Sequence, residues 1–139
     1  MRLVGNDYFM PVAMSLLVLA LWFSGRSLPE LERHQKAVLI AFVAMGLSNL
    51  LVKFINWGFF RPRPFDVLDN VHLLFYRPTD SSLPSNTAVV AFTLVGAVMP
   101  FHRRLGTVLL GMALLLSLAR IFMGVHFPLD ELTGAALGY

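Results

Sequence analysis

The sequence has 139 residues, of which 57% are hydrophobic and only 14% are charged, whereas soluble domains carry about 25% charged residues. A chain of this length is too short to bury that apolar excess in its own interior, which excludes a water-soluble globular domain. The net charge of +3 is spread among apolar runs, which argues against nucleic-acid binding, and the lack of cysteine excludes disulfides and thiolate metal sites.

Four apolar stretches have about the length that a helix needs to cross a bilayer. They cover residues 8–25, 37–60, 85–101 and 105–125. A fifth helix starts at Pro128, a residue suited to a first helical turn, but only twelve residues follow Phe127. The sequence therefore predicts an all-α, polytopic membrane helix bundle. It would have four full transmembrane helices and a fifth that is truncated in this chain, in a single domain over residues 1–139.

Gly134 and Gly138 stand four residues apart in the fifth predicted helix. Small residues at this spacing let the backbones of neighbouring membrane helices approach closely. We therefore expect close contact between this helix and one of its neighbours.

Counting the crossings assigns each connection to one membrane face. The N-terminus, residues 61–84 and the turn at 124–131 share one face, and residues 25–36 and 102–104 share the opposite face. The opposite face carries five cations, namely Arg26, Arg33, Lys36, Arg103 and Arg104. The first face carries six, but four of them belong to the candidate site described next. Short cytoplasmic loops are enriched in Lys and Arg, so we expect a plasma (inner) membrane protein whose site faces the non-cytoplasmic side.

Polar residues from four separate helix ends gather at that first face. In chain order they are Lys53, Asn56, Arg61, Arg63, Ser85, Asn86, Thr87, Arg120, His126 and Asp130. Scattered surface polarity would not sort to one face in this way. Charged residues near or within membrane segments are costly and by default indicate function.

These residue types favour an anion site. Guanidinium groups bind phosphate oxygens in a bidentate manner, and the start of the third helix offers unpaired N–H groups and a positive dipole end. Taken singly, Lys53 could be a side chain that extends to the membrane interface, and Arg61 and Arg63 could be ordinary juxtamembrane anchors. Arg120 is harder to explain in that way, because it lies inside an apolar helix.

His126 and Asp130 stand four residues apart around the start of the fifth helix. At that spacing the carboxylate can accept a hydrogen bond from one imidazole nitrogen. This would fix the tautomer and leave the other nitrogen for nucleophilic attack or proton transfer. The alternative for this pair alone is a helix-capping histidine beside an interfacial acid.

Three motifs resemble those of the type 2 phosphatidic acid phosphatase superfamily, which includes the vanadium haloperoxidases. The family's motifs are a Lys followed by Arg-Pro, a Pro-Ser-x-His, and a Ser-Arg followed by His and Asp. In this chain they are Lys53…Arg61-Pro62-Arg63-Pro64, Pro84-Ser85-Asn86-Thr87 and Ala119-Arg120-x5-His126-x3-Asp130. The resemblance runs from about residue 50 to the end. It is most specific in the third motif and looks most like the bacterial undecaprenyl-diphosphate phosphatases of this superfamily.

The resemblance implies a lipid phosphatase that works through a phosphohistidine. His126 would be the nucleophile, and Asp130 would orient it. The phosphoryl oxygens would be held by Arg63 or Arg61, Arg120, Lys53, Ser85 and the amides from Asn86 onward. The partner would be a membrane lipid that carries a phosphate or diphosphate. No metal or cofactor is implied, because in-line phosphoryl transfer needs mainly positioning and charge neutralisation.

The first and third motifs each depart from the family pattern. The family has six residues between the Lys and the Arg of Arg-Pro, whereas Lys53 has seven before Arg61 and nine before Arg63. The family spacing counted back from Arg63 reaches Asn56. In the third motif Ala119 replaces a serine, which removes one phosphate donor.

The second motif is degenerate, because Thr87 stands where the family has the histidine that protonates the leaving group. A threonine hydroxyl cannot act as a general acid near neutral pH, and such catalysis is worth about 10²–10⁴-fold. A diphosphate substrate would suffer less, since its leaving group is a phosphate that needs little protonation. His72, in the loop on the same face, is either a substitute acid or an ordinary exposed loop histidine.

Two functions therefore stay open. The first is an active phosphatase that hydrolyses a prenyl diphosphate, which the joint presence of Arg120, His126 and Asp130 favours. The second is a catalytically impaired family member that binds lipid or serves as an accessory subunit of a larger membrane assembly, which Thr87 favours. A channel or transporter is disfavoured, because the chain has no second half that would give inverted repeats.

Overall fold

The structure is a computed structural model of the chain, in which residues 7–67 and 78–139 are described. Within these ranges the chain is helical and has no β-strand. The helices are α1 (Phe9–Leu21), α2 (Leu28–Gly58), α3 (Pro64–Val67), α4 (Asn86–Val98), α5 (Arg103–Phe122) and α6 (Pro128–Gly138). The predicted all-α class is confirmed for this part of the chain. His72 lies outside the described residues.

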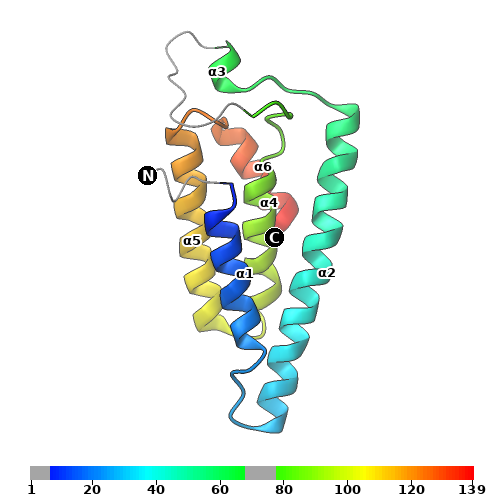
Figure 1. Cartoon of the computed structure of the whole chain (residues 1–139), viewed down its shortest axis with the longest axis vertical. Helices are drawn as coiled ribbons and strands as arrows, with labels where there is room; N and C mark the ends of the chain where they lie inside the picture. The colour runs from blue at the N-terminus through cyan, green and yellow to red at the C-terminus, as the bar shows by residue number, and fades with distance from the viewer. Residues whose placement is uncertain (1–6, 68–77) are drawn as a thin grey trace.

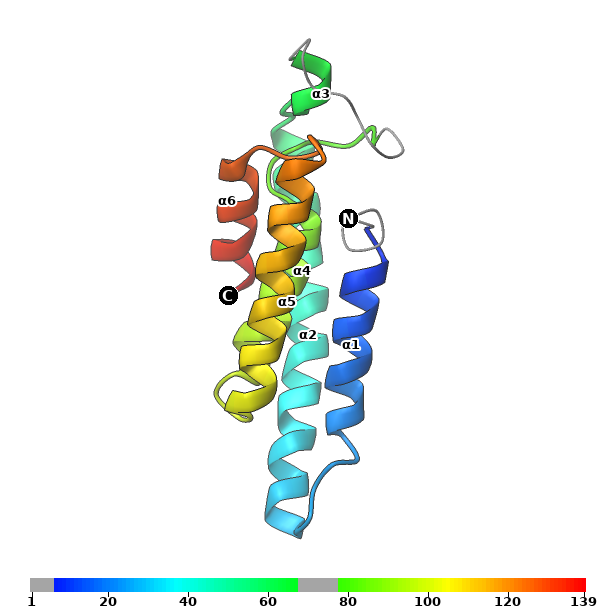
Figure 2. The same ribbon diagram turned by 90° about the vertical axis from the view of Figure 1, so that its left-hand side faces the viewer.

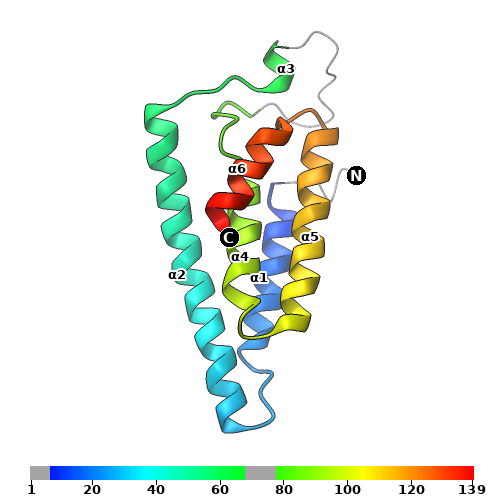
Figure 3. The same cartoon turned by 180° about the vertical axis from the view of Figure 1, so that it is seen from behind.

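Helix α4 is the centre of the bundle. Ten of its 13 residues are buried, and it contacts α1, α2, α5 and α6, as Figures 1 and 3 show from opposite sides. Figure 2 shows α1 and α6 on opposite sides of the bundle. The small side chains of α4 let four helices approach one axis. The core around it includes Met14, Val18, Val38, Leu94, Leu109 and Leu116.

Helix α2 starts well before its apolar stretch. It begins at Leu28, with Pro29 in the first turn, where a missing amide hydrogen costs nothing. Glu30 lies at the positive end of the helix dipole, and its carboxylate accepts a hydrogen bond from the amide of Arg26 at 3.0 Å. Most of the polar segment at 25–36 is therefore the first part of a helix.

Two of the described helices, α2 and α5, are long and apolar enough to cross a membrane. Helices α1 and α4 have 13 residues each, or about 20 Å at 1.5 Å per residue, which is less than the hydrocarbon thickness of about 30 Å. Four full transmembrane helices are thus not confirmed. In the third apolar stretch, Ser85 caps the helix from outside, and Pro100 prevents it from continuing.

The outer faces of α2 and α5 are apolar. In their most apolar stretches only 17% and 33% of the residues are buried inside the bundle, whereas the core helix of a soluble protein would be mostly buried. The exposed side chains include Leu39, Val43, Leu47, Phe54, Leu114, Leu118 and Phe122. Soluble monomers rarely expose contiguous apolar patches larger than a few hundred Å², so this surface suits a lipid bilayer.

The predicted site residues lie at one end of the bundle. The ends of α2 and α5 and the starts of α4 and α6 lie toward the upper end of Figure 1, and the α1–α2 and α4–α5 connections lie toward the other end. This is the alternation that the order of crossings predicts. Sequence-distant polar residues therefore share one small region.

Helix α6 packs against α4 at very short range. A Cβ atom added to Gly134 would lie 2.7 Å from the carbonyl oxygen of Ser85, and one added to Gly138 would overlap the carbonyl oxygen of Val89. The close contact predicted from the glycine spacing is confirmed. It brings the start of α6 onto α4, where the amide of Ser85 donates to the carbonyl oxygen of Asp130 at 3.1 Å.

We expect Gly134→Ala to lower the free energy of unfolding by about 1–3 kcal/mol, the usual cost of overpacking. The added methyl group must push α6 away from the backbone of α4. Thermal unfolding of the purified protein in detergent measures the effect. Gly111→Ala is the matched control, because a Cβ there would meet nothing within 4 Å. Equal stability of the two variants would contradict the close packing.

Candidate active site

A polar cavity of about 190 Å³ lies at the upper end of the bundle. Its lining residues come from the chain before α1, the chain after α2, the chain before α4, the start of α4, the end of α5 and the α5–α6 turn. Its wall is formed by Asp7, Tyr8, Arg63, Pro78, Asp80, Asn86, Thr87, Arg120 and His126. The structure therefore brings together five of the residues that the sequence singled out, namely Arg63, Asn86, Thr87, Arg120 and His126.

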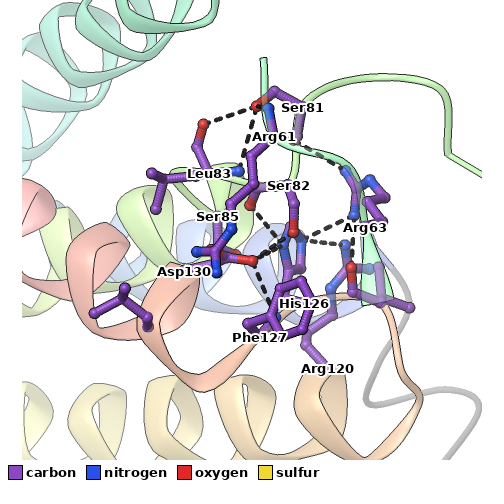
Figure 4. A network of polar contacts seen from close by, with 12 residues as sticks. Arg61, Arg63, Ser81, Ser82, Leu83, Ser85, Arg120, His126, Phe127 and Asp130 are labelled. Atoms are coloured by element: carbon purple, nitrogen blue, oxygen red, sulfur yellow. Dashed lines mark hydrogen bonds and ion pairs between the residues drawn. The ribbon is translucent and has the colours of Figure 1, made fainter. Parts of the chain in front are cut away.

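His126 lies between two arginines, as Figure 4 shows. The residue is only 3% exposed. Its Nε2 atom lies 3.2 Å from Nη1 of Arg63 and 3.1 Å from Nη2 of Arg120. Its Nδ1 atom lies 2.9 Å from the carbonyl oxygen of Ser82, which can only accept a hydrogen bond. Nδ1 therefore carries the ring proton, and the lone pair of Nε2 points toward the guanidinium groups.

Burial, and then the positive charges of Arg120 and Arg63, hold the pKa of His126 well below its ordinary value of 6.5. Because the charged form is disfavoured, the ring is neutral at physiological pH. A neutral imidazole whose Nε2 atom is unprotonated is a nucleophile.

Asp130 acts on His126 through Ser82 and not by a direct hydrogen bond. Its Oδ2 atom lies 3.9 Å from Nδ1 of His126, which is too far for a hydrogen bond. The fully buried carboxylate accepts from the hydroxyl of Ser82, from the amide of Phe127 at 3.0 Å and from Nη1 of Arg61 at 2.6 Å. The expected hydrogen bond from the imidazole to Asp130 is therefore absent, and the imidazole bonds to the backbone carbonyl of Ser82 instead. The carbonyl of Ser82 fixes the tautomer, and Asp130 holds Ser82 and the start of α6.

The structure separates the two arginines of the Arg-Pro-Arg-Pro sequence. Arg63 is 3% exposed, lines the cavity and donates to the carboxylate of Asp80 at 2.7 Å. Arg61 is absent from the cavity wall. It pairs with Asp130, and its Cζ atom lies 4.6 Å from the centre of the Phe127 ring. Of the two, only Arg63 lines the cavity.

The N-terminus of α4 also reaches the cavity. Asn86 and Thr87 are its first two residues and line the cavity wall, so first-turn amides and the positive dipole end lie beside it. Ser85 lies deeper and is fully buried. Its hydroxyl lies 3.2 Å from that of Thr87 and accepts from the amide of Ala88 at 3.4 Å. Ser85 is the cap of α4 and is not part of the cavity wall.

Lys53 does not line this cavity. It lies on α2 beside Asn56, in the wall of a second cavity that shares Asp80 and Asn86 with the first. Lys53 is thus farther along the chain from Arg63 than the family spacing predicts, and it lines a different cavity from Arg63.

Three acids that the sequence analysis did not single out lie near the cavity arginines. Asp7 forms an ion pair with Nη1 of Arg120, and Asp80 pairs with Nη2 of Arg63 at 2.7 Å. Glu131 is 3% exposed and close enough to Arg120 to interact with it electrostatically. Only Glu131 had a signal in the sequence, as a second acid directly after Asp130 in an apolar helix. Asp7 and Asp80 use the arginine donors that a phosphate group would use, so an anion must compete with them.

Residues 37–139 match the family described as the PAP2 superfamily. The chain belongs to this superfamily. Among its relatives is the bacitracin transport permease protein BcrC of Bacillus licheniformis, which is 29% identical over 142 residues, or 97% of this chain and 70% of that protein. The undecaprenyl-diphosphatase BcrC of Bacillus subtilis is 34% identical over 122 residues, or 87% of this chain and 60% of that protein. The chain thus spans less than two thirds of the length of the Bacillus subtilis protein.

Two solved PAP2-type structures resemble the bundle. The crystal structure of Aquifex aeolicus LpxE has a TM-score of 0.71 and 29% identity, and the match covers 99% of this chain and 86% of that one. The transmembrane PAP2 type phosphatidylglycerolphosphate phosphatase of Bacillus subtilis has a TM-score of 0.66, with 96% of this chain and 65% of that one covered. At 20% identity, the second likeness shows the shared fold alone. The superfamily that the motifs indicated is confirmed.

We expect the lowered pKa of His126 to make stability depend on pH. Below about pH 6.5 the unfolded chain binds a proton at this histidine and the folded chain does not, so stability falls by up to about 1.4 kcal/mol per pH unit. The midpoint of thermal unfolding should therefore drop more between about pH 7.5 and about pH 5.5 in the wild type than in His126→Asn. The other three histidines are present in both proteins and cancel. Parallel pH dependence in the two proteins would contradict a buried neutral His126.

We expect Asp7→Asn to tighten the binding of inorganic phosphate by about tenfold, because the variant removes a negative charge that competes for Arg120. Isothermal titration of the purified protein measures the dissociation constant. Asp66→Asn, in α3 at the same end but outside the cavity wall, is the matched control. Unchanged or weaker phosphate binding in Asp7→Asn would show that Asp7 does not compete with the anion.

Proposed function

We propose that this protein is a membrane lipid phosphatase that hydrolyses a prenyl diphosphate through a phosphohistidine on His126. The observation that carries the proposal is the Nε2 lone pair of a buried, neutral His126 placed between the guanidinium groups of Arg63 and Arg120. The similarity to a Bacillus subtilis protein named undecaprenyl-diphosphatase supports the substrate class.

The proposed reaction has two steps. Nε2 of His126 attacks the terminal phosphorus, and an N–P bond forms as the bond from that phosphorus to the bridging oxygen breaks. The electron pair leaves on the bridging oxygen, which becomes part of a lipid monophosphate. A water molecule then attacks the phosphorus, the N–P bond breaks with its electron pair returning to Nε2, and both water hydrogens stay with the released phosphate. The ring proton stays on Nδ1, next to the carbonyl oxygen of Ser82.

Positioned positive charge would provide most of the catalysis. Arg63, Arg120 and the first-turn amides of α4 surround the place where the phosphoryl oxygens would lie. In-line phosphoryl transfer depends mainly on such positioning and charge neutralisation. The proposal therefore needs no metal ion or cofactor.

Thr87 determines the choice of a diphosphate over a monoester. It lines the cavity at the position where the family has its leaving-group acid. The alkoxide that leaves a phosphate monoester is a strong base and requires a proton, which a threonine hydroxyl does not supply at neutral pH. The monophosphate that leaves a diphosphate is a weak base and departs as an anion.

We also propose that the bundle lies in the plasma (inner) membrane, with the His126 end on the non-cytoplasmic side. The apolar outer faces of α2 and α5 support the membrane location. Arg33, Arg103 and Arg104 line a cavity at the opposite end of the bundle, where the positive-inside rule places cytoplasmic cations.

The test is the release of inorganic phosphate by the purified protein from undecaprenyl diphosphate and from phosphatidic acid. We expect release from the diphosphate, its loss in His126→Ala, and release from phosphatidic acid that is slower by about 10²–10⁴-fold. Thr87→His should raise the phosphatidic acid rate more than the diphosphate rate. If the wild type releases phosphate from neither lipid and Thr87→His does, the alternative of an impaired, lipid-binding accessory subunit replaces the proposal.

A further inference from the structure

A second cavity adjoins the catalytic cavity on the side of α2. It has a volume of about 390 Å³ and shares Asp80 and Asn86 with the catalytic cavity. Lys53 and Asn56 line the second cavity and are absent from the first. The two cavities are therefore neighbouring compartments, and Asn86 at the start of α4 belongs to both.

The polar end of the second cavity contains two groups, on Lys53 and Asn56, that could bind an anion. In this structure Asp80 pairs with Arg63 at 2.7 Å, whereas Lys53 makes no ion pair with any described residue. The Oδ1 atom of Asn56 is buried and has no hydrogen-bond partner, which is costly for a polar atom. Rotating the amide by half a turn exchanges its oxygen and its NH₂ group with almost no change of shape. A bound anion would then give this amide a partner.

The position of Lys53 in the sequence explains why it lines the second cavity and not the first. Arg63 is the arginine of the catalytic cavity, and the family spacing counted back from it reaches Asn56. Lys53 lies three residues earlier, which is almost one helical turn and about 4.5 Å along the axis. The lysine therefore lies away from the catalytic cavity and lines the neighbouring one.

We propose that Lys53, together with Asn56 and Asn86, forms a subsite for the phosphate that remains on the lipid when the terminal phosphate is transferred. This inference rests on the proposed function and adds a residue that selects diphosphates over monophosphates. The rest of the second cavity includes Gly46, Leu50 and Val52, which suits the first carbon atoms of the attached lipid.

The subsite also explains how the chemistry proceeds with threonine at position 87. As the bond between the terminal phosphorus and the bridging oxygen breaks, the bridging oxygen gains the electron pair and negative charge. That charge develops on the phosphate beside Lys53. The ammonium group of Lys53 then stabilises the leaving group by charge, in place of the proton that a histidine would donate.

The test compares two non-hydrolysable ligands. One is a prenyl methylenediphosphonate, in which a CH₂ group replaces the bridging oxygen, and the other is the prenyl monophosphonate of the same chain length. Titration of the purified protein in detergent gives the dissociation constants. We expect Lys53→Gln to weaken the diphosphonate by about ten- to a hundredfold, the usual effect of losing a charge-assisted contact. The monophosphonate should change by less than about twofold, and Lys53→Arg should restore most of the diphosphonate affinity.

Lys36→Gln is the matched control, because it removes the chain's other lysine, near the opposite end of the same helix. It should bind both ligands as the wild type does. Equal weakening of the two ligands by Lys53→Gln, or no weakening of either, would overturn the subsite. Because binding needs no turnover, a subsite that is present in a protein that fails to hydrolyse prenyl diphosphates would refute the proposed function and leave this inference standing.

Discussion

The buried carboxylate of Asp130 holds together the end of the bundle that carries His126. It accepts from Arg61, from Ser82 and from the amide of Phe127, while the carbonyl oxygen of the same residue accepts from the amide of Ser85. One residue thus ties the chain after α2, the chain before α4 and the start of α6 to one another. Removing one partner of a buried charge leaves the other uncompensated at a cost of about 3–5 kcal/mol, so this arrangement is strongly specified. The glycines of α6 make this arrangement possible, because any side chain at Gly134 would push Asp130 away from α4.

The chemistry follows from this scaffold. Because Asp130 holds Ser82, the Ser82 carbonyl can fix the proton on Nδ1 of His126 and leave Nε2 unprotonated, with its lone pair toward Arg63 and Arg120. The guanidinium groups of Arg63 and Arg120 have two effects at once. They disfavour a second proton on the ring, and they provide the donors that a phosphoryl group requires. The same positive charges attract Asp7 and Asp80, so binding of an anion is an exchange of partners.

Much of this arrangement was predictable from the sequence. The apolar stretches indicate an all-helical membrane bundle, and the parity of crossings brings Arg63, Arg120 and His126 to one end. The glycine spacing in α6 indicates its close packing. Helix lengths were less predictable, because the cap at Ser85 and the proline at position 100 shorten α4 within a continuous apolar stretch.

The finer geometry had no sequence signal. Arg61 and Arg63 stand two residues apart and carry the same chemistry, so only the path of the chain separates their roles. The group that orients His126 is a backbone carbonyl, which every residue has. Asp7 lies 113 residues before its partner Arg120, and no local pattern links positions so far apart.

The proposed transfer of the terminal phosphoryl group to His126 can be tested directly. Prenyl diphosphate with a radioactive label on either the terminal or the lipid-proximal phosphorus is mixed with the wild-type protein, and the reaction is quenched in alkaline detergent, where phosphohistidine survives. After proteolysis, the labelled peptide is identified by mass spectrometry. The expected result is label on His126 from the terminal phosphorus only. Steady release of phosphate with no labelled protein, or with label on another residue, would contradict a histidine nucleophile.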